Sequence, residues 1–211
     1  MLFKRGKTMW ANFLQDADDL FDPVAGLNDL GVVRSFRMGM VHTREHLVAA
    51  LRLAQPGGCH DTLCYNFQVG TALLVALLDG MAVYVEKKLA VPPGQQGAVY
   101  WARHTTFIDP RFAELRAIQQ RTNGYIIRGG ITVNTLRNLA KHYLPWLPLS
   151  GTSARVADEP WDVRFPLDAA KTTLSGPVLS GLLFPLFNDA CDACAAFGRL
   201  VGQEVGVIQR L

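Results

Sequence analysis

The chain has 211 residues, of which 49% are hydrophobic and 18% charged, and its formal net charge is +3. This apolar content excludes an intrinsically disordered chain. The sequence has no fixed period, which excludes a collagen-like, coiled-coil or repeat protein. The length is typical of one domain, so we predict a single domain over residues 1–211.

The first residues and the cysteines bear on where the protein is found. Basic residues near the start are not followed by the apolar run of a secretory signal. Four cysteines in a chain long enough to build a core are typical of free thiols in a reducing compartment. We therefore expect a cytoplasmic protein.

The first part of the chain predicts two helices. Residues 9–21 can form a short helix that ends before Pro23, because proline disfavours helix in the residue preceding it. Thr43 is a suitable N-cap for a helix over 44–55, which Pro56-Gly57-Gly58 would end.

A long apolar helix is predicted over about 62–90, with Asp61 as its cap. Its large apolar residues recur at helical spacing: Leu63, Phe67, Leu74, Leu77, Met81 and Tyr84. Asp79 interrupts the uncharged run before it reaches the ~18 residues of a membrane span, and a charge inside a bilayer is costly. We therefore expect the central helix of a bundle and no membrane association.

Shorter elements follow. A helix is expected near 97–105, and Asp109-Pro110 is typical of the N-cap and first position of a helix that continues to about 122. Turn residues bound the segment 124–130, which is either a turn or a short strand.

The last part of the chain predicts two more helices and an insertion. Asn134 can cap a helix over about 135–144, and a final helix over about 177–203 contains Pro185, which should kink it. Between them, residues 150–172 are rich in turn formers and predict a short β-hairpin or an ordered loop. The expected fold is an all-α helical bundle with this insertion.

Positive charge is concentrated in residues 101–150. Seven basic and two acidic residues give this block a charge of +5, and the remainder of the chain carries −2. A local basic excess suits a phosphate-bearing partner such as RNA. Solvent-facing helix surfaces carry similar charge, so both interpretations remain open at this point.

One short segment in the basic block has the residue types of a catalytic site. Arg137 is followed directly by Asn138 and, five positions on, by His142. This Arg-Asn-x-x-x-His segment on a late helix of a helical chain resembles the HEPN (higher eukaryotes and prokaryotes nucleotide-binding) superfamily. The resemblance implies an all-α, metal-independent endoribonuclease or RNA-binding protein of a stress or defence system, with no cofactor. It also implies a homodimer, because family members commonly form the site between two copies of the motif.

The resemblance gives each of these residues a role. Arg137 would hold the scissile phosphate, His142 would act as general acid and base for attack by the ribose 2′-hydroxyl, and Asn138 would orient the pair. Histidine exchanges protons near neutral pH, and the arginine fork matches phosphate while staying charged. Further nucleic-acid contacts are expected from Lys141, Arg128 and Arg121.

A second Arg-x-x-x-x-His match, Arg37 to His42, lacks the polar residue after the arginine. Its presence shows that the spacing alone arises by chance. The alternative for Arg137 and His142 is an exposed basic helix end, whose cations suit the C-terminal dipole. The first alternative function is accordingly a non-catalytic helical protein-interaction module.

The second alternative is a zinc-stabilised helical protein. Cys59 and Cys64 lie near one predicted helix start, and Cys191 and Cys194 lie in the last predicted helix, so the four thiols could form one site if these helices met. Buried structural cysteine is the other interpretation, and no metal is expected under it.

Overall fold

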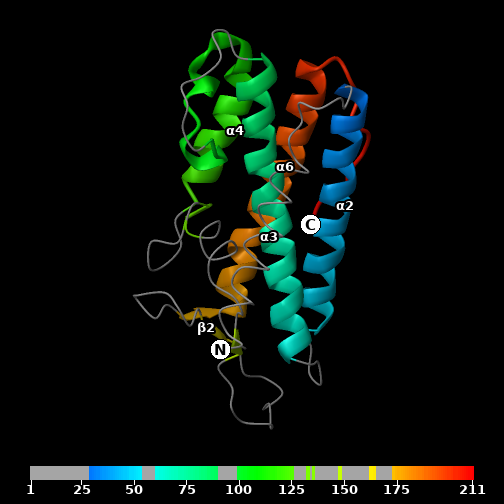
Figure 1. The fold of residues 1–211 in the computed structure, drawn as a ribbon. Helices are drawn as coiled ribbons and strands as arrows, with labels where there is room; N and C mark the ends of the chain where they lie inside the picture. Colours follow the sequence, from blue (N-terminus) through cyan, green and yellow to red (C-terminus); the bar gives the residue numbers. More distant parts are fainter. Residues whose placement is uncertain are drawn as a thin grey trace, which may run out of the picture.

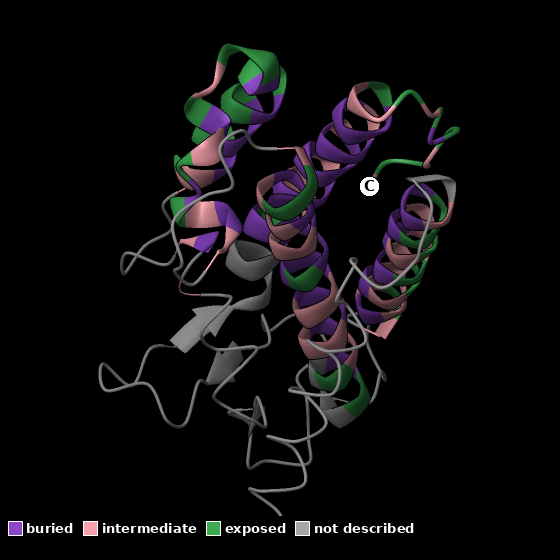
Figure 2. Ribbon diagram, turned by 45° about the horizontal axis from the view of Figure 1, so that its top comes forward, coloured by how far each residue is buried: buried purple, intermediate pink, exposed green. Residues whose placement is uncertain are grey.

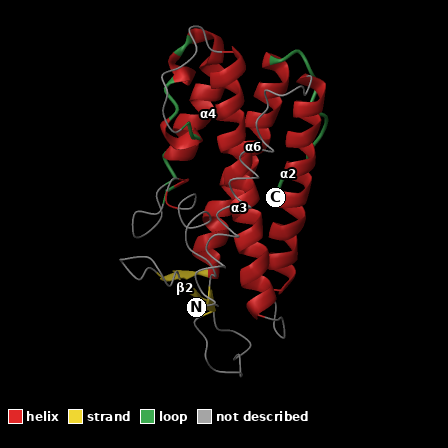
Figure 3. Cartoon of the chain, viewed as in Figure 1, coloured by secondary structure: helices red, strands yellow, loops and turns green. Residues whose placement is uncertain are grey.

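The structure, a computed structural model, describes residues 29–53, 60–89, 99–125, 132, 133, 135, 147, 148, 162–164 and 173–211. Most of the described residues are helical (Figure 3). The helices are α2 (Asp29–Leu53), α3 (His60–Tyr84), α4 (Ala113–Asn123) and α6 (Gly176–Leu200). A π-helical turn, Val85–Leu89, continues α3, and three 3-10 turns precede α4: Trp101–Arg103, Thr106–Ile108 and Pro110–Phe112.

The long helices α2 and α3 lie side by side and make the most extensive contact among the helices that the structure describes (Figure 1). Glycines bring them close together. A Cβ atom at Gly39 would lie 2.6 Å from Leu77 Cδ2, and one at Gly70 would lie 2.9 Å from Leu47 Cδ2. Larger residues at these two positions would therefore push the two helices apart.

The third long helix, α6, closes the core. Buried positions line the facing sides of α2, α3 and α6 (Figure 2). The ring of Phe197 in α6 makes edge contacts with Phe36 of α2 and Tyr84 of α3, at centroid distances of 5.1 and 5.2 Å. Edge-to-face aromatic pairs of this kind add about 0.5–1.5 kcal/mol each beyond the burial of their surface. One aromatic side chain thus joins all three helices.

Trp101 fixes the short turns against the bundle. It is fully buried, its backbone N–H donates to Asp79 Oδ1 at 2.8 Å, and its indole N–H donates to Thr122 Oγ1 at 2.9 Å. Asp79, the charge that interrupts the apolar run of α3, therefore caps a backbone group of the 3-10 segment. The position of α4 follows from this contact and from its packing on α6.

The all-α prediction is confirmed for the described residues, with corrections to individual elements. Thr43 does not begin a helix: it lies inside α2, fully buried, and its hydroxyl donates to the carbonyl of Gly39 at 2.8 Å. Where a helix was predicted near 97–105, the described residues contain one 3-10 turn, Trp101–Arg103, and a second, Thr106–Ile108, follows it. Asp109 does cap the following turn, because its side chain accepts from Arg111 N.

Other predictions fall largely on residues that the structure does not describe, including the helices at 9–21 and 135–144. Three short strands, β1 (Leu147–Pro148), β2 (Asp162–Arg164) and β3 (Thr173–Ser175), pair antiparallel in the order β1-β2-β3. These few residues do not establish the insertion over about 150–172, which stays a prediction.

Within the described residues, one helical stretch, Tyr65–Leu89, is long and apolar enough to cross a membrane by length and composition alone. More than half of that stretch is buried inside the bundle. Packing against α2 and α6 therefore explains much of its apolar character, and the expectation of no membrane association stays a prediction.

Candidate functional site

The chain reverses direction where α6 ends. Gly202 adopts φ of 71°, its N–H donates to the carbonyl of Arg199, and the N–H of Gln203 donates to the carbonyl of Gly198 at 2.8 Å. This pair of hydrogen bonds is a Schellman motif, in which a left-handed glycine ends a helix and turns the chain back. Residues 203–211 then run beside α6 and α2 (Figure 1). We call these residues the 203–211 segment.

Gly198 allows the segment to lie directly on the helix. A Cβ atom at Gly198 would lie 2.5 Å from the carbonyl oxygen of Gln203 and 2.6 Å from Val205 Cγ2. Both distances are too short for any side chain, and the first involves backbone that cannot rotate away. The buried glycine is therefore required by the returning chain.

The far end of the segment is held through its backbone. Asn188 in α6 donates from Nδ2 to the carbonyl of Leu211 at 3.0 Å and accepts the N–H of Leu211 on Oδ1 at 3.1 Å. A side-chain amide that satisfies both backbone groups of one residue imitates a neighbouring β-strand. This contact is made to the backbone and is therefore independent of the side chain at that position.

Side chains of the segment supply apolar and charged contacts. Val205 is buried, Ile208 and Leu211 pack against the core while partly exposed, and Val207 on the opposite side is 91% exposed. The guanidinium of Arg210 pairs with Asp192 of α6. We call Arg37, Asn188, Asp192 and Gly198 the docking surface; Arg37 belongs to it because its Nε lies 3.4 Å from where a Cβ at Gly206 would stand.

The same Asp192 also faces α4. Arg121 Nη2 lies 3.0 Å from Asp192 Oδ2, and Arg121 Nε donates to Asp189 Oδ1 at 2.5 Å. Asp189 is almost fully buried and accepts a second hydrogen bond from the hydroxyl of Tyr125. Burial, with Asp189 beside it, raises the pKa of Tyr125 to about 12, so this hydroxyl remains a donor at neutral pH.

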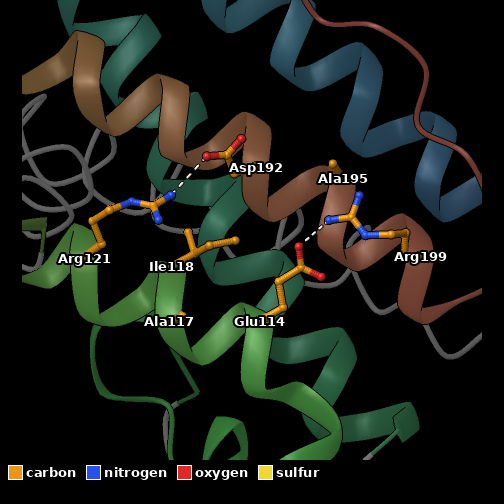
Figure 4. A pocket seen from close by; sticks show the side chains of 7 residues that line it. All are labelled: Glu114, Ala117, Ile118, Arg121, Asp192, Ala195 and Arg199. Carbon is orange, nitrogen blue, oxygen red and sulfur yellow. Dashed lines mark hydrogen bonds and ion pairs between the residues drawn. The ribbon is translucent and has the colours of Figure 1, made fainter.

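A shallow pocket of about 270 Å³ lies between α4 and α6 at this point (Figure 4). Arg121 and Arg199 reach it from the two helices, and each is paired with a carboxylate, Asp192 and Glu114 respectively. The remaining lining residues are Ala117, Ile118 and Ala195. The pocket therefore presents balanced charge, whereas an RNA-binding surface needs net positive charge.

Arg121 is the one predicted nucleic-acid contact whose side chain the structure describes. Its charge is shared with two aspartates, although 46% of its side chain is exposed. The others, Arg128 and Lys141, and the proposed catalytic residues Arg137, Asn138 and His142, lie outside the described residues. Their roles stay predictions.

The second Arg-x-x-x-x-His match lies in α2. His42 is exposed, and its Nδ1 lies 3.0 Å from Glu45 Oε2, while Arg37 is on the docking surface. His42 is therefore paired with a carboxylate of its own helix.

The cysteines of the last helix are free and buried. Burial raises the pKa of Cys191 to about 12 and raises that of Cys194 as well. Zinc binds thiolates, so such sites disfavour it. Cys59 and the side chain of Cys64 are not described, and the described residues contain no cluster of three or more potential metal ligands.

A buried histidine forms a cluster that sequence reasoning missed. His104 is nearly inaccessible, its Nδ1 accepts the N–H of Thr106 at 3.1 Å, and its Nε2 lies 3.5 Å from Glu86 Oε2. The Thr106 hydroxyl donates to the same carboxylate. Burial lowers the pKa of His104 to about 4, so the ring is neutral near pH 7. No spacing rule links Glu86 with His104, because they lie on different elements.

The docking of the 203–211 segment was also missed. Its signal was present as glycines at positions 198, 202 and 206 and aliphatic residues at 205, 208 and 211, both just where the last predicted helix ends. Comparison with known proteins adds no guidance, since no family model, curated protein or solved structure matches this chain.

Proposed function

We propose that this chain is a helical protein-interaction module whose binding site is the docking surface between α6 and α2. The observation that carries the proposal is the double hydrogen bond between Asn188 and the backbone of Leu211. Main-chain hydrogen bonds give affinity for an extended segment regardless of its sequence, and side-chain contacts then give selectivity.

The bound segment defines what the surface accepts. Aliphatic residues contact the core at 205, 208 and 211, three positions apart, and a basic residue at 210 meets Asp192. A suitable ligand is therefore a segment with aliphatic side chains at this spacing, a cation before the last of them, and a glycine that adopts the left-handed conformation of Gly206.

A labelled synthetic peptide of residues 203–211, titrated against the full chain by fluorescence anisotropy, tests the proposal. The chain's own segment competes, so Ile208→Ser in the chain should weaken the competitor and increase peptide binding. Adding Asn188→Ala should abolish that gain. Val207→Ser is the matched control, because Val207 is exposed and its loss should change nothing. Absence of peptide binding to the Ile208→Ser chain would refute the proposal.

A second candidate is RNA cleavage by a HEPN-like site, in the cytoplasm and in a homodimer. What supports it is the Arg137-Asn138-x-x-x-His142 segment in a chain whose described part is mainly helical. Arg137 would hold phosphate and His142 would transfer the proton without a metal ion. The predicted insertion over about 150–172 would follow this site in the chain.

Cleavage of a labelled RNA pool tests this candidate. His142→Ala should abolish cleavage and leave the circular dichroism spectrum unchanged, whereas His42→Ala, in the other Arg-x-x-x-x-His match, should cleave normally. RNA binding should weaken as salt rises, because phosphate contacts release counterions. Equal cleavage by the His142→Ala variant and the unaltered chain would eliminate the candidate.

A further inference from the structure

We propose that the 203–211 segment exchanges between two copies of this chain, so that each copy's segment occupies the docking surface of the other. The inference rests on the proposed function, because it assumes that the docking surface binds a segment of this sequence. The partner is a second copy of this chain, whose segment has the same sequence and therefore fits the docking surface.

The contacts of the segment are separable from its connection to α6. Asn188 and Asp192 hold residues 211 and 210 respectively, and neither contact involves the turn at Gly202. A segment that arrives from another copy can therefore make them unchanged. Exchange of identical elements is a low-cost route to a dimer for this reason.

The segment is also held lightly enough to leave. Gly206, Val207 and Gln209 are exposed, and Val205 is the one buried residue of the 203–211 segment. Arg210 is paired with Asp192 at the surface, where ion pairs contribute little. Elements with few buried contacts open locally without unfolding the rest of the protein.

Two glycines with nearly the same φ allow exchange to be distinguished from docking within one copy. Gly202, in the turn, has φ of 71°, and Gly206, in the docked segment, has φ of 75°. Exchange opens the turn, so residue 202 is released from its left-handed conformation in the dimer. Residue 206 keeps its conformation in both forms, because the docked segment is the same.

The matched pair Gly202→Ala and Gly206→Ala tests the proposal by analytical ultracentrifugation. A side chain in the left-handed region disfavours that conformation by about tenfold. Gly202→Ala destabilises the closed monomer but not the dimer, in which the turn at residue 202 is open. Because one dimer forms from two such monomers, the dimer dissociation constant should fall about a hundredfold. Gly206→Ala penalises both forms and should not promote dimerisation.

Adding Asn188→Ala to Gly202→Ala identifies the contact that joins the copies. The double variant should return to the monomer, because its docking surface no longer binds the segment backbone. A Gly202→Ala chain that stays monomeric up to its solubility limit would overturn exchange. So would a dimer that persists with Asn188→Ala.

Failure of exchange and failure of the docking surface give different results. If the 203–211 peptide binds the Ile208→Ser chain while Gly202→Ala remains monomeric, exchange alone is wrong. If the peptide does not bind and Gly202→Ala remains monomeric, the proposed function fails with it.

Discussion

Gly198→Ala gives the sharpest test of how the 203–211 segment is held, because its effect on stability depends on whether the segment is docked. In an isolated helix, replacing an interior glycine by alanine is stabilising by about 0.8–1.0 kcal/mol. In the docked structure, the added methyl group would lie 2.5 Å from the carbonyl oxygen of Gln203 and 2.6 Å from Val205 Cγ2. The gain in helix propensity and the steric overlap therefore change the free energy of unfolding in opposite directions.

The overlap sets the size of the effect. Overpacking a buried site costs about 1–3 kcal/mol. The cost has an upper limit, since the segment can leave the helix once the strain exceeds its free energy of docking. After subtraction of the helix gain, Gly198→Ala should lower the free energy of unfolding by about 0–2 kcal/mol.

Gly181→Ala supplies the control on the same helix. Gly181 is exposed, and a Cβ atom placed there meets nothing within 4 Å. This variant should therefore be more stable than the unaltered chain by about 0.5–1 kcal/mol. The two variants should differ by about 1–3 kcal/mol in urea unfolding followed by circular dichroism.

Amide hydrogen exchange locates the change. Residues 203–211 should exchange faster in Gly198→Ala and at the normal rate in Gly181→Ala. If Gly198→Ala were as stabilising as Gly181→Ala, with unchanged exchange in the segment, the close approach of Gln203 and Val205 to α6 would be wrong.

Two further predictions concern buried ionisable groups. Asp189→Ala removes a buried carboxylate that Arg121 and a tyrosine hydroxyl contact, so it should lower the free energy of unfolding by about 2–3 kcal/mol. Glu114 belongs to an exposed ion pair, so Glu114→Ala should change the free energy of unfolding by less than about 0.5 kcal/mol in the same urea assay. Equal effects would contradict the assigned burial. Because the pKa of His104 is about 4 in the folded chain and 6.5 unfolded, the unfolded chain binds more protons between these values. Stability should therefore fall as pH drops from 6.5 towards 4, by at most about 1.4 kcal/mol per pH unit, and His104→Gln should show a correspondingly smaller slope in urea titrations.

The helices could be predicted from local patterns, and the errors arose where tertiary contacts decide. The apolar spacing along α3 and the Asp109 cap are local signals, and both are present in the structure. Thr43 has the chemistry of a cap, but inside α2 its hydroxyl bonds back to Gly39 one turn earlier. The 3-10 turns near Trp101 depend on Asp79, which is 22 residues away, so no local pattern could reveal them.

The site was harder to predict than the fold for the same physical reason. Charge counted along the chain placed Arg121 in a basic block, but folding brings Asp189 and Asp192 to it from α6, some 70 residues later. In the folded chain its charge is therefore shared with carboxylates that a count along the sequence does not bring to it. The docking of residue 211 on Asn188 likewise joins positions 23 residues apart.

Asp192 links two parts of the molecule that do not otherwise share a contact described above. Its two oxygens are divided between Arg210 of the 203–211 segment and Arg121 of α4. When the segment leaves, the carboxylate loses one cation and both of its oxygens become available to the other. Asp192 then pairs with Arg121 alone, so the electrostatic potential around this carboxylate, which lines the pocket between α4 and α6, becomes more negative. Occupancy of the docking surface is thus transmitted to this pocket as electrostatic potential, through the one carboxylate that contacts both.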